Sequence, residues 1–217
     1  MTALHSAVQA PDWLRGLFAV IPTPMRPDGE LDLASLDRVV DHYHAGGAAG
    51  LVPVSVAGEG DLLSAAERRM VVRRVVQRAA GRMPVLVGVL QAQPDAALTQ
   101  AREAADCGAR GLLVLPPRTQ PESICQHFGA IARAVDLPLV VLDHPRLCPP
   151  LPPVLLQALA EAVPQVCGIK LEDEPTPPKM AQVRQLLGQR LRIFGGLSGA
   201  YCLQELAHGA DGFFTGL

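Results

Sequence analysis

The sequence predicts an α/β protein built as a (β/α)8 TIM barrel, with eight parallel strands that alternate with helices. Eight short apolar runs recur along the chain, separated by segments with helical spacing. Near-continuous apolar strands are typical of a parallel sheet covered by helices, and eight strands at this spacing favour a closed barrel. The expected strands are residues 17–21, 50–55, 84–89, 111–115, 138–142, 166–171, 192–195 and 212–217.

The connecting segments carry helix signals. The stretch 64–80 begins with Ser64, and Glu67 follows three residues later, which is the pattern of a capping box. The proline-rich pieces 149–153 and 175–178 are short enough to be loops that enter the fifth and sixth helices.

Length and composition fit a single domain. The 217 residues, 49% of them hydrophobic, can bury the core of one large α/β domain or of two small ones, but no linker divides the chain. We expect an N-terminal arm at residues 1–16 and the barrel at 17–217. A doubly wound sheet is the competing architecture. Its glycine fingerprint is absent after the first strand, where the chain reads Thr23-Pro24-Met25.

The end of the chain is unusual for a barrel. The eighth strand finishes at Leu217 with no eighth helix to cover it, so the closing seam is expected to be partly exposed. Three explanations stay open at this point: a fragment of a longer product, a shortened protein, or a barrel completed by a neighbouring subunit.

Charge and cysteine content limit the kinds of partner and the cellular compartment that we expect for this protein. The formal net charge is −2, and no block of like charges suggests nucleic acid or a membrane surface. Five scattered cysteines without a CxxC pair suit reduced thiols, so we expect a cytoplasmic protein. The sequence supports neither a signal peptide nor a membrane anchor.

Lys170 is the most informative residue. It is one of two lysines in a chain that carries 17 arginines, and it follows the apolar run 166–169. A lysine held among apolar residues can become a nucleophilic amine, whereas an arginine stays protonated. The pattern predicts a Schiff-base former, and the alternative is a side chain that reaches water from the strand end.

Function in a (β/α)8 barrel gathers at the C-terminal ends of the strands. Lys170 lies at such an end, with other polar or flexible residues at neighbouring ends. These residues are Thr23, Ser55 to Glu59, Pro117, Arg118, Asp143, His144, Arg146, Glu172 and Gly195 to Gly199.

Four motifs agree in order and spacing with one known family. They are residues 20–24, residues 57–59 with Leu63-Ser64, residues 84–89, and Gly168-Ile169-Lys170. Through them the chain resembles the dihydrodipicolinate synthase and N-acetylneuraminate lyase family of pyruvate-type class I aldolases. The resemblance implies that Lys170 forms a Schiff base with a 2-oxo acid, without a metal or an organic cofactor. It also implies a homo-oligomer, a dimer or a tetramer.

The resemblance also implies a carboxylate site. The backbone N–H groups of Ser55, Val56, Ala57 and Gly58 would bind the substrate carboxylate beside Glu59. The alternative is a tight turn that needs Gly58 and nothing more.

The chain departs from the family pattern around the lysine. Two threonines usual in the family are replaced by Val56 and Ala57, and the tyrosine usual on strand five is replaced by Leu142. The Pro-Tyr-Tyr pattern after strand four becomes Pro-Pro-Arg, ending in Arg118. The standard tyrosine acid/base and its neighbour are therefore both missing.

A Schiff-base enzyme must still move protons. His144 is the most natural substitute, because it is two residues from Leu142 and should share its face. It can also sit simply at the loop edge. Asp143 and Glu172 are alternative proton carriers, or carboxylates paired to Arg146 or Arg118. Those arginines can instead hold a sugar acid or a second carboxylate.

Residues 170–173 and 194–199 resemble a divergent branch of the family that contains dehydratases of 2-keto-3-deoxy sugar acids. This resemblance implies that Glu172 and Gly196 also contribute to substrate binding. We therefore expect an aldolase or dehydratase that acts on pyruvate or a 2-oxo sugar acid. The alternative is a catalytically degenerate barrel that binds a small carboxylate or a partner subunit without turnover.

Overall fold

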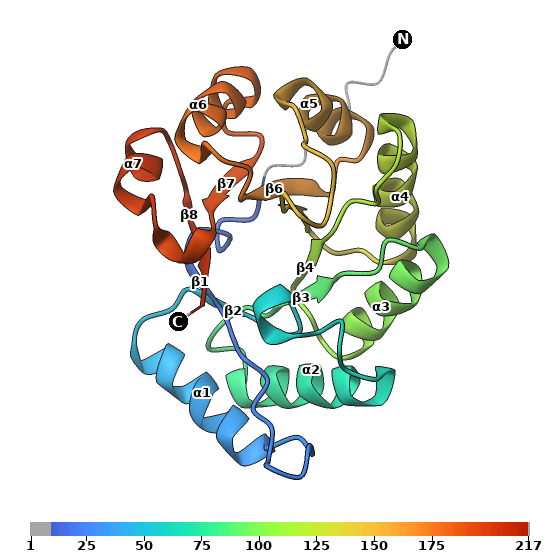
Figure 1. Ribbon diagram of the computed structural model, residues 1–217, viewed down its shortest axis with the longest axis vertical. Helices are drawn as coiled ribbons and strands as arrows, with labels where there is room; N and C mark the ends of the chain where they lie inside the picture. Colours follow the sequence, from blue (N-terminus) through green and yellow to red (C-terminus); the bar gives the residue numbers. More distant parts are fainter. Residues whose placement is uncertain (1–9, 217) are drawn as a thin grey trace.

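A computed structural model of the chain describes residues 10–216 (Figure 1). Its eight strands are parallel and form one sheet in the order β2-β1-β8-β7-β6-β5-β4-β3. A bridge between Leu51 and Val85 links the two end strands, so the sheet closes into a barrel. This confirms the (β/α)8 fold. The strands are β1 (Gly16–Val20), β2 (Gly50–Val52), β3 (Leu86–Val89), β4 (Gly111–Val114), β5 (Leu139–Asp143), β6 (Val166–Leu171), β7 (Arg192–Gly195) and β8 (Gly212–Thr215).

Helices alternate with the strands and cover the outside of the barrel (Figure 1). Helix α2 begins with the predicted capping box, because Ser64 accepts from the amide of Glu67 and Glu67 accepts from the amide of Ser64. The helices are α1 (Leu33–Ala45), α2 (Ala65–Ala79), α3 (Pro94–Asp106), α4 (Pro121–Ala134), α5 (Pro153–Ala162), α6 (Thr176–Leu187) and α7 (Cys202–Ala207).

The barrel interior is packed with large apolar side chains. The rings of Phe18, Phe194 and Phe214 lie within 5.8 Å of one another, measured between centroids, and all three are buried. Leu14, which precedes β1, is fully buried in the same cluster. Residues 1–9 of the predicted arm lie outside the described residues.

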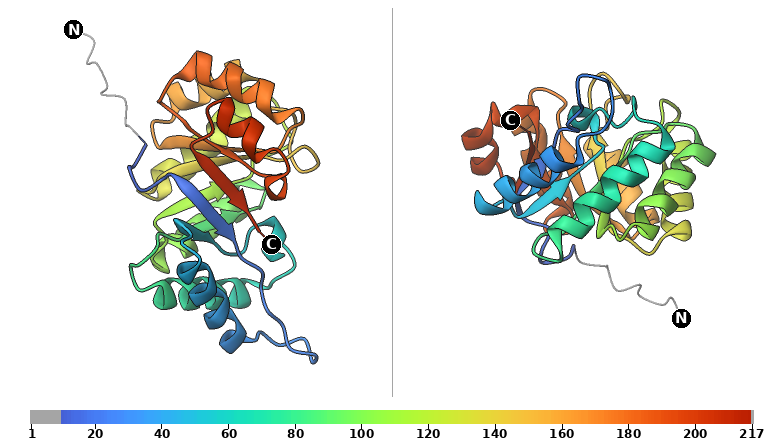
Figure 2. Two further views of the ribbon diagram at one scale, coloured as in Figure 1. Left: turned by 90° about the vertical axis from the view of Figure 1, so that its left-hand side faces the viewer. Right: turned by 90° about the horizontal axis from the view of Figure 1, so that it is seen from below.

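Strands β1 and β8 lie side by side, as the side view in Figure 2 shows. Among residues 10–216 no helix follows β8, as expected. Apolar side chains are exposed on both elements that flank this seam: Leu17 of β1 is 40% exposed, and Leu203 and Leu206 of α7 are 76% and 52% exposed.

Strand β2 ends earlier than predicted. Val54 has a φ of 49°, which a strand does not permit and which a β-branched residue rarely adopts. Two glycines accommodate this bend: a Cβ on Gly60 would lie 2.0 Å from the Val54 carbonyl oxygen, and one on Gly88 would lie 2.6 Å from it. The chain therefore turns away from the sheet just before the predicted carboxylate loop.

Candidate active site

Lys170 lies on β6 with its side chain toward the barrel interior. Its backbone is in register with Leu142 of β5 and Phe194 of β7, both of which belong to the interior cluster. The flanking Ile169 and Leu171 pack in the outer layer against the helices, so the alternation of the strand places Lys170 inside. The residue is 6% exposed.

Glu172 is the charged partner of Lys170. Its Oε1 lies 3.1 Å from the Nζ of Lys170 and also accepts the amide N–H of Leu197 at 3.2 Å. Glu172 is 8% exposed, and its Oε2 has no hydrogen-bond partner among the described residues. A carboxylate and an amine are therefore held together out of bulk water, which strengthens their interaction.

Gly196 makes room for this carboxylate. A Cβ at this position would lie 2.4 Å from Cγ and 2.5 Å from Oε1 of Glu172. The next two residues, Leu197 and Ser198, have φ angles of 48° and 52°, so the chain turns sharply after β7. This turn directs the Leu197 amide at Glu172.

His144 follows β5 and is half-buried. Burial lowers the pKa of its ring, the carboxylate of Glu172 opposes that effect, and the charges of Lys170 and Arg146 add to it. Its Nδ1 accepts the backbone N–H of Arg146 at 3.3 Å. We therefore assign the proton of the neutral ring to Nε2, which leaves His144 a donor on its other side.

The side chain of Asp143 at the end of β5 points outward to the helices, whereas that of Lys170 on β6 points into the barrel. Its Oδ2 is 2.7 Å from the Nζ of Lys179 on α6, and Lys179 also contacts Asp173 at 2.8 Å. Burial raises the pKa of Asp143 to about 6, and Lys179 partly offsets this. The geometry does not bring Asp143 to the amine of Lys170. The predicted pairing of Asp143 with Arg146 or Arg118 is therefore wrong, and its partner is Lys179, the second lysine of the chain.

The predicted carboxylate loop forms a short 3-10 turn, Val56–Gly58, after the fully buried Ser55. The amides of Gly58 and Gly60 both donate to the carbonyl of Ser55, at 3.0 and 3.2 Å. The amides of Val56 and Ala57 open the turn and have no acceptor within it.

Two neighbours fix the position of this loop. Thr23 donates to the carbonyl of Gly58 at 2.7 Å, and a Cβ on Gly58 would lie 2.8 Å from the carbonyl oxygen of Ile21. Glu59 ends the turn with a φ of 54° and is exposed. The sequence predicted only that Thr23 lies at a strand end, and in the structure it anchors this loop through its hydrogen bond to Gly58.

The two candidate arginines lie at the surface. Arg118 follows β4 and Arg146 follows β5, and both are exposed. The guanidinium of Arg118 donates to the backbone carbonyl of Arg146, so the two loops are tied together. Neither arginine contacts Glu172, whose partner is Lys170.

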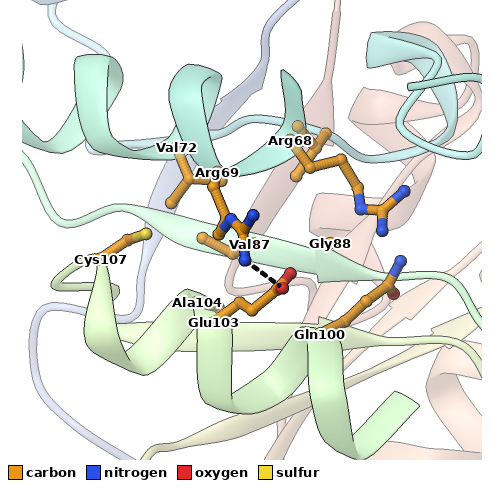
Figure 3. A pocket seen from close by; sticks show the side chains of 10 residues that line it. Arg68, Arg69, Val72, Val87, Gly88, Gln100, Glu103, Ala104 and Cys107 are labelled. Carbon is orange, nitrogen blue, oxygen red and sulfur yellow. Dashed lines mark hydrogen bonds and ion pairs between the residues drawn. The ribbon is translucent and has the colours of Figure 1, made fainter. Parts of the chain in front are cut away.

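A separate recess lies outside the barrel, between α2 and α3 (Figure 3). It is lined by Arg68 and Gln100, and an ion pair of 3.1 Å joins Arg69 to Glu103. Its floor includes the outward-facing Val87 of β3, so the recess is separate from Lys170 inside the barrel.

Residues 10–216 contain no cluster of three or more histidine, cysteine, aspartate or glutamate residues that suits a metal ion. No helix in the described part of the chain is both long and apolar enough to cross a membrane.

The sequence model of the dihydrodipicolinate synthetase family matches residues 13–216. The chain belongs to this family. A 4-hydroxy-tetrahydrodipicolinate synthase of Sorangium cellulosum is 35% identical over 207 residues, which cover 93% of this chain and 68% of that protein. The predicted family and the expected class of enzyme, a lyase, are thus confirmed.

Solved structures agree with the fold. The dihydrodipicolinate synthase of Rhodopseudomonas palustris has a TM-score of 0.86 and 32% identity, over 97% of this chain and 72% of that one. The enzyme of Acinetobacter baumannii, solved in complex with pyruvate, has a TM-score of 0.86 and 27% identity, over 95% of this chain and 69% of that one. The chain thus spans about two thirds of the length of these family members.

Proposed function

We propose that the protein is a Schiff-base lyase that acts on pyruvate or a 2-keto-3-deoxy sugar acid through Lys170. The observation that carries this proposal is the buried pair of Lys170 and Glu172 at the C-terminal end of β6, with 3.1 Å between amine and carboxylate. An amine beside a proton acceptor in a site shielded from water suits nucleophilic attack on a ketone. The iminium formed at Lys170 then acts as the electron sink for cleavage, condensation or loss of water.

The substrate carboxylate binds at the 3-10 turn in this proposal. The amides of Val56 and Ala57 lack acceptors within the turn, and backbone N–H groups in such a turn favour an anion. Because neither side chain has a hydroxyl, the turn contributes backbone donors without a proton relay.

The rim of the site suits a substrate longer than pyruvate. Arg118 and Arg146 are exposed on tethered loops after β4 and β5, where a guanidinium can bind the hydroxyl groups or a second carboxylate of a sugar acid. In this proposal His144, with its proton assigned to Nε2, donates a hydrogen bond to the bound acid. Dehydration or aldol cleavage of a hydroxylated 2-oxo acid therefore fits the site better than the synthesis of dihydrodipicolinate.

One observation favours a second candidate, a barrel that binds a small carboxylate without turnover. The chain has two tyrosines, and neither occupies the place of the family acid/base. Tyr43 lies on α1, and Tyr201 donates to Glu174 at 2.7 Å. A site without that acid can still bind an oxo acid.

Trapping with borohydride tests the proposal. Pyruvate and a 2-keto-3-deoxy sugar acid are each mixed with the protein and borohydride, and the intact mass is measured. The wild type should gain one reduced oxo acid, Lys170→Arg should gain none, and Lys179→Arg should behave as the wild type because arginine can keep the ion pair with Asp143. An adduct that persists in Lys170→Arg contradicts the proposal. Thermal stabilisation by the oxo acid without any adduct favours the binding barrel.

A further inference from the structure

We infer that Glu172 is the proton carrier for Lys170 and replaces the tyrosine that the chain lacks. This inference rests on the proposed function and deepens it, since it assigns the catalytic acid/base of the same site. Three groups near the strand ends are available for the role, namely His144, Asp143 and Glu172, and their surroundings in the structure separate them.

Asp143 points to the other side of β5 and is paired with Lys179. The ring of His144 uses Nδ1 to accept the amide of Arg146, so its free side is a donor and a poor base. Glu172 alone of these three has a carboxylate oxygen at 3.1 Å from the amine of Lys170. That distance lies within direct proton-transfer reach.

The protein holds this carboxylate in place. Leu197 donates its amide to Oε1, and the missing side chain of Gly196 leaves the space that Glu172 occupies. The remaining oxygen, Oε2, is buried and has no partner among the described residues. A buried polar atom without a partner is costly to folding and calls for an explanation, and a role in proton transfer is one such explanation. Glu205, a second buried carboxyl nearby, also has one oxygen without a partner, but its other oxygen accepts from Thr176 at 2.6 Å, whereas that of Glu172 lies at the amine of Lys170.

Glu172 can carry the proton that leaves Lys170 and return it later during formation of the Schiff base. The ammonium of Lys170 gives a proton to Glu172, and the lone pair of the neutral amine attacks the ketone carbon of the 2-oxo acid, whose C=O electron pair moves to oxygen. A proton then passes from the nitrogen to that oxygen and gives a carbinolamine. Glu172 returns its proton to the hydroxyl group, which leaves as water while the nitrogen lone pair forms the iminium. Glu172 ends as a carboxylate, as it began.

The test compares Glu172→Gln with Glu174→Gln, the same change at an exposed carboxylate two residues further on. One measurement is the rate of borohydride trapping of pyruvate, and another is the exchange of the pyruvate methyl protons for deuterium, followed by NMR. Glu172→Gln should slow trapping by about 100-fold, and Glu174→Gln should trap at the rate of the wild type. Thermal unfolding of each variant reports whether it is folded.

Glu172→Ala with added formate separates a proton carrier from a residue that only supports the fold. Formate should restore part of the trapping rate in Glu172→Ala, because it supplies a carboxylate in the vacated space, and chloride at the same concentration should not. A folded variant that stays slow with formate overturns the inference, and so does a Glu172→Gln protein that traps as fast as the wild type. In both cases the proposed function stands. If the wild type traps no 2-oxo acid, the proposed function and the inference fail together.

Discussion

Asp143 and Lys179 form a partly buried ion pair between β5 and α6, with 2.7 Å between Oδ2 and Nζ. The pair lies on the outer side of the strands, whereas Lys170 points into the barrel, and Asp143 is fully buried. Its second oxygen, Oδ1, has no partner within the described residues. The ion pair with Lys179 therefore offsets only part of the cost of burying this carboxylate. Asp143 is a pH-sensitive element of the fold and does not face the amine of Lys170.

This pair predicts a specific dependence of stability on pH. Burial raises the pKa of Asp143 from 3.8 to about 6, against the opposing effect of Lys179. Between these values the folded protein binds more protons than the unfolded chain, so the contribution of Asp143 to the free energy of unfolding falls as the pH rises from about 4 to about 6. The full contribution is at most about 3 kcal/mol.

Denaturant unfolding at several pH values checks this expectation. Asp143→Asn removes the titration, so its free energy of unfolding should rise relative to that of the wild type between about pH 4 and pH 7. Asp136→Asn makes the same change at an exposed carboxylate and serves as the matched control. If the Asp143→Asn difference from the wild type is constant across this range, Asp143 is not the titrating group.

The buried cysteines should resist alkylation in the native protein. Burial raises the pKa of Cys148 to about 11 and that of Cys167 to about 12, and both side chains are almost fully buried. Cys202 is partly exposed at the start of α7. Because the thiolate is the reactive form, iodoacetamide at pH 8 should label Cys202 first, and labelling at the other two should require unfolding. Peptide mapping by mass spectrometry after timed quenching measures the order. Early labelling of Cys148 would mean that the loop after β5 opens in the native state.

Much of the fold was predictable because each strand and helix has its own local pattern. The predicted bounds of β6 and β7 coincide with those in the structure, since both strands are apolar runs with clear ends. The early end of β2 was not predictable in this way. It depends on the positive φ of Val54, which is tolerated because Gly60 and Gly88 lie against its carbonyl from elsewhere in the chain.

The candidate site likewise has features that the sequence could predict and features that it could not. The sequence left Glu172 either as a proton carrier or as a partner of Arg146 or Arg118, and the structure pairs it with Lys170 at 3.1 Å. The partner of Asp143 was missed, because the approach of Lys179 depends on how α6 packs against β5. The role of Gly196 was also hidden, because a residue that acts by leaving space has no side chain for a pattern to reveal.

Gly196→Ala tests whether this space matters for the chemistry. A Cβ would lie 2.4 Å from Cγ of Glu172, so the carboxylate must move away from Lys170 or the turn after β7 must shift. Overpacking of this kind costs about 1–3 kcal/mol of stability. We expect slower trapping of pyruvate at Lys170, whereas Gly46→Ala, with its nearest contact at 3.4 Å and an ordinary φ of −76°, should trap as the wild type does.

The double variant shows through which residue Gly196 acts. If Gly196→Ala slows trapping by displacing the carboxylate, adding it to Glu172→Gln should slow the reaction little further, because the proton carrier is already lost. Two effects that simply multiply would mean that Gly196 acts on the site independently of Glu172, for instance through the turn that holds the Leu197 amide. The coupling between the two substitutions, measured as a ratio of trapping rates, therefore decides whether the glycine after β7 and the carboxylate after β6 form one functional unit.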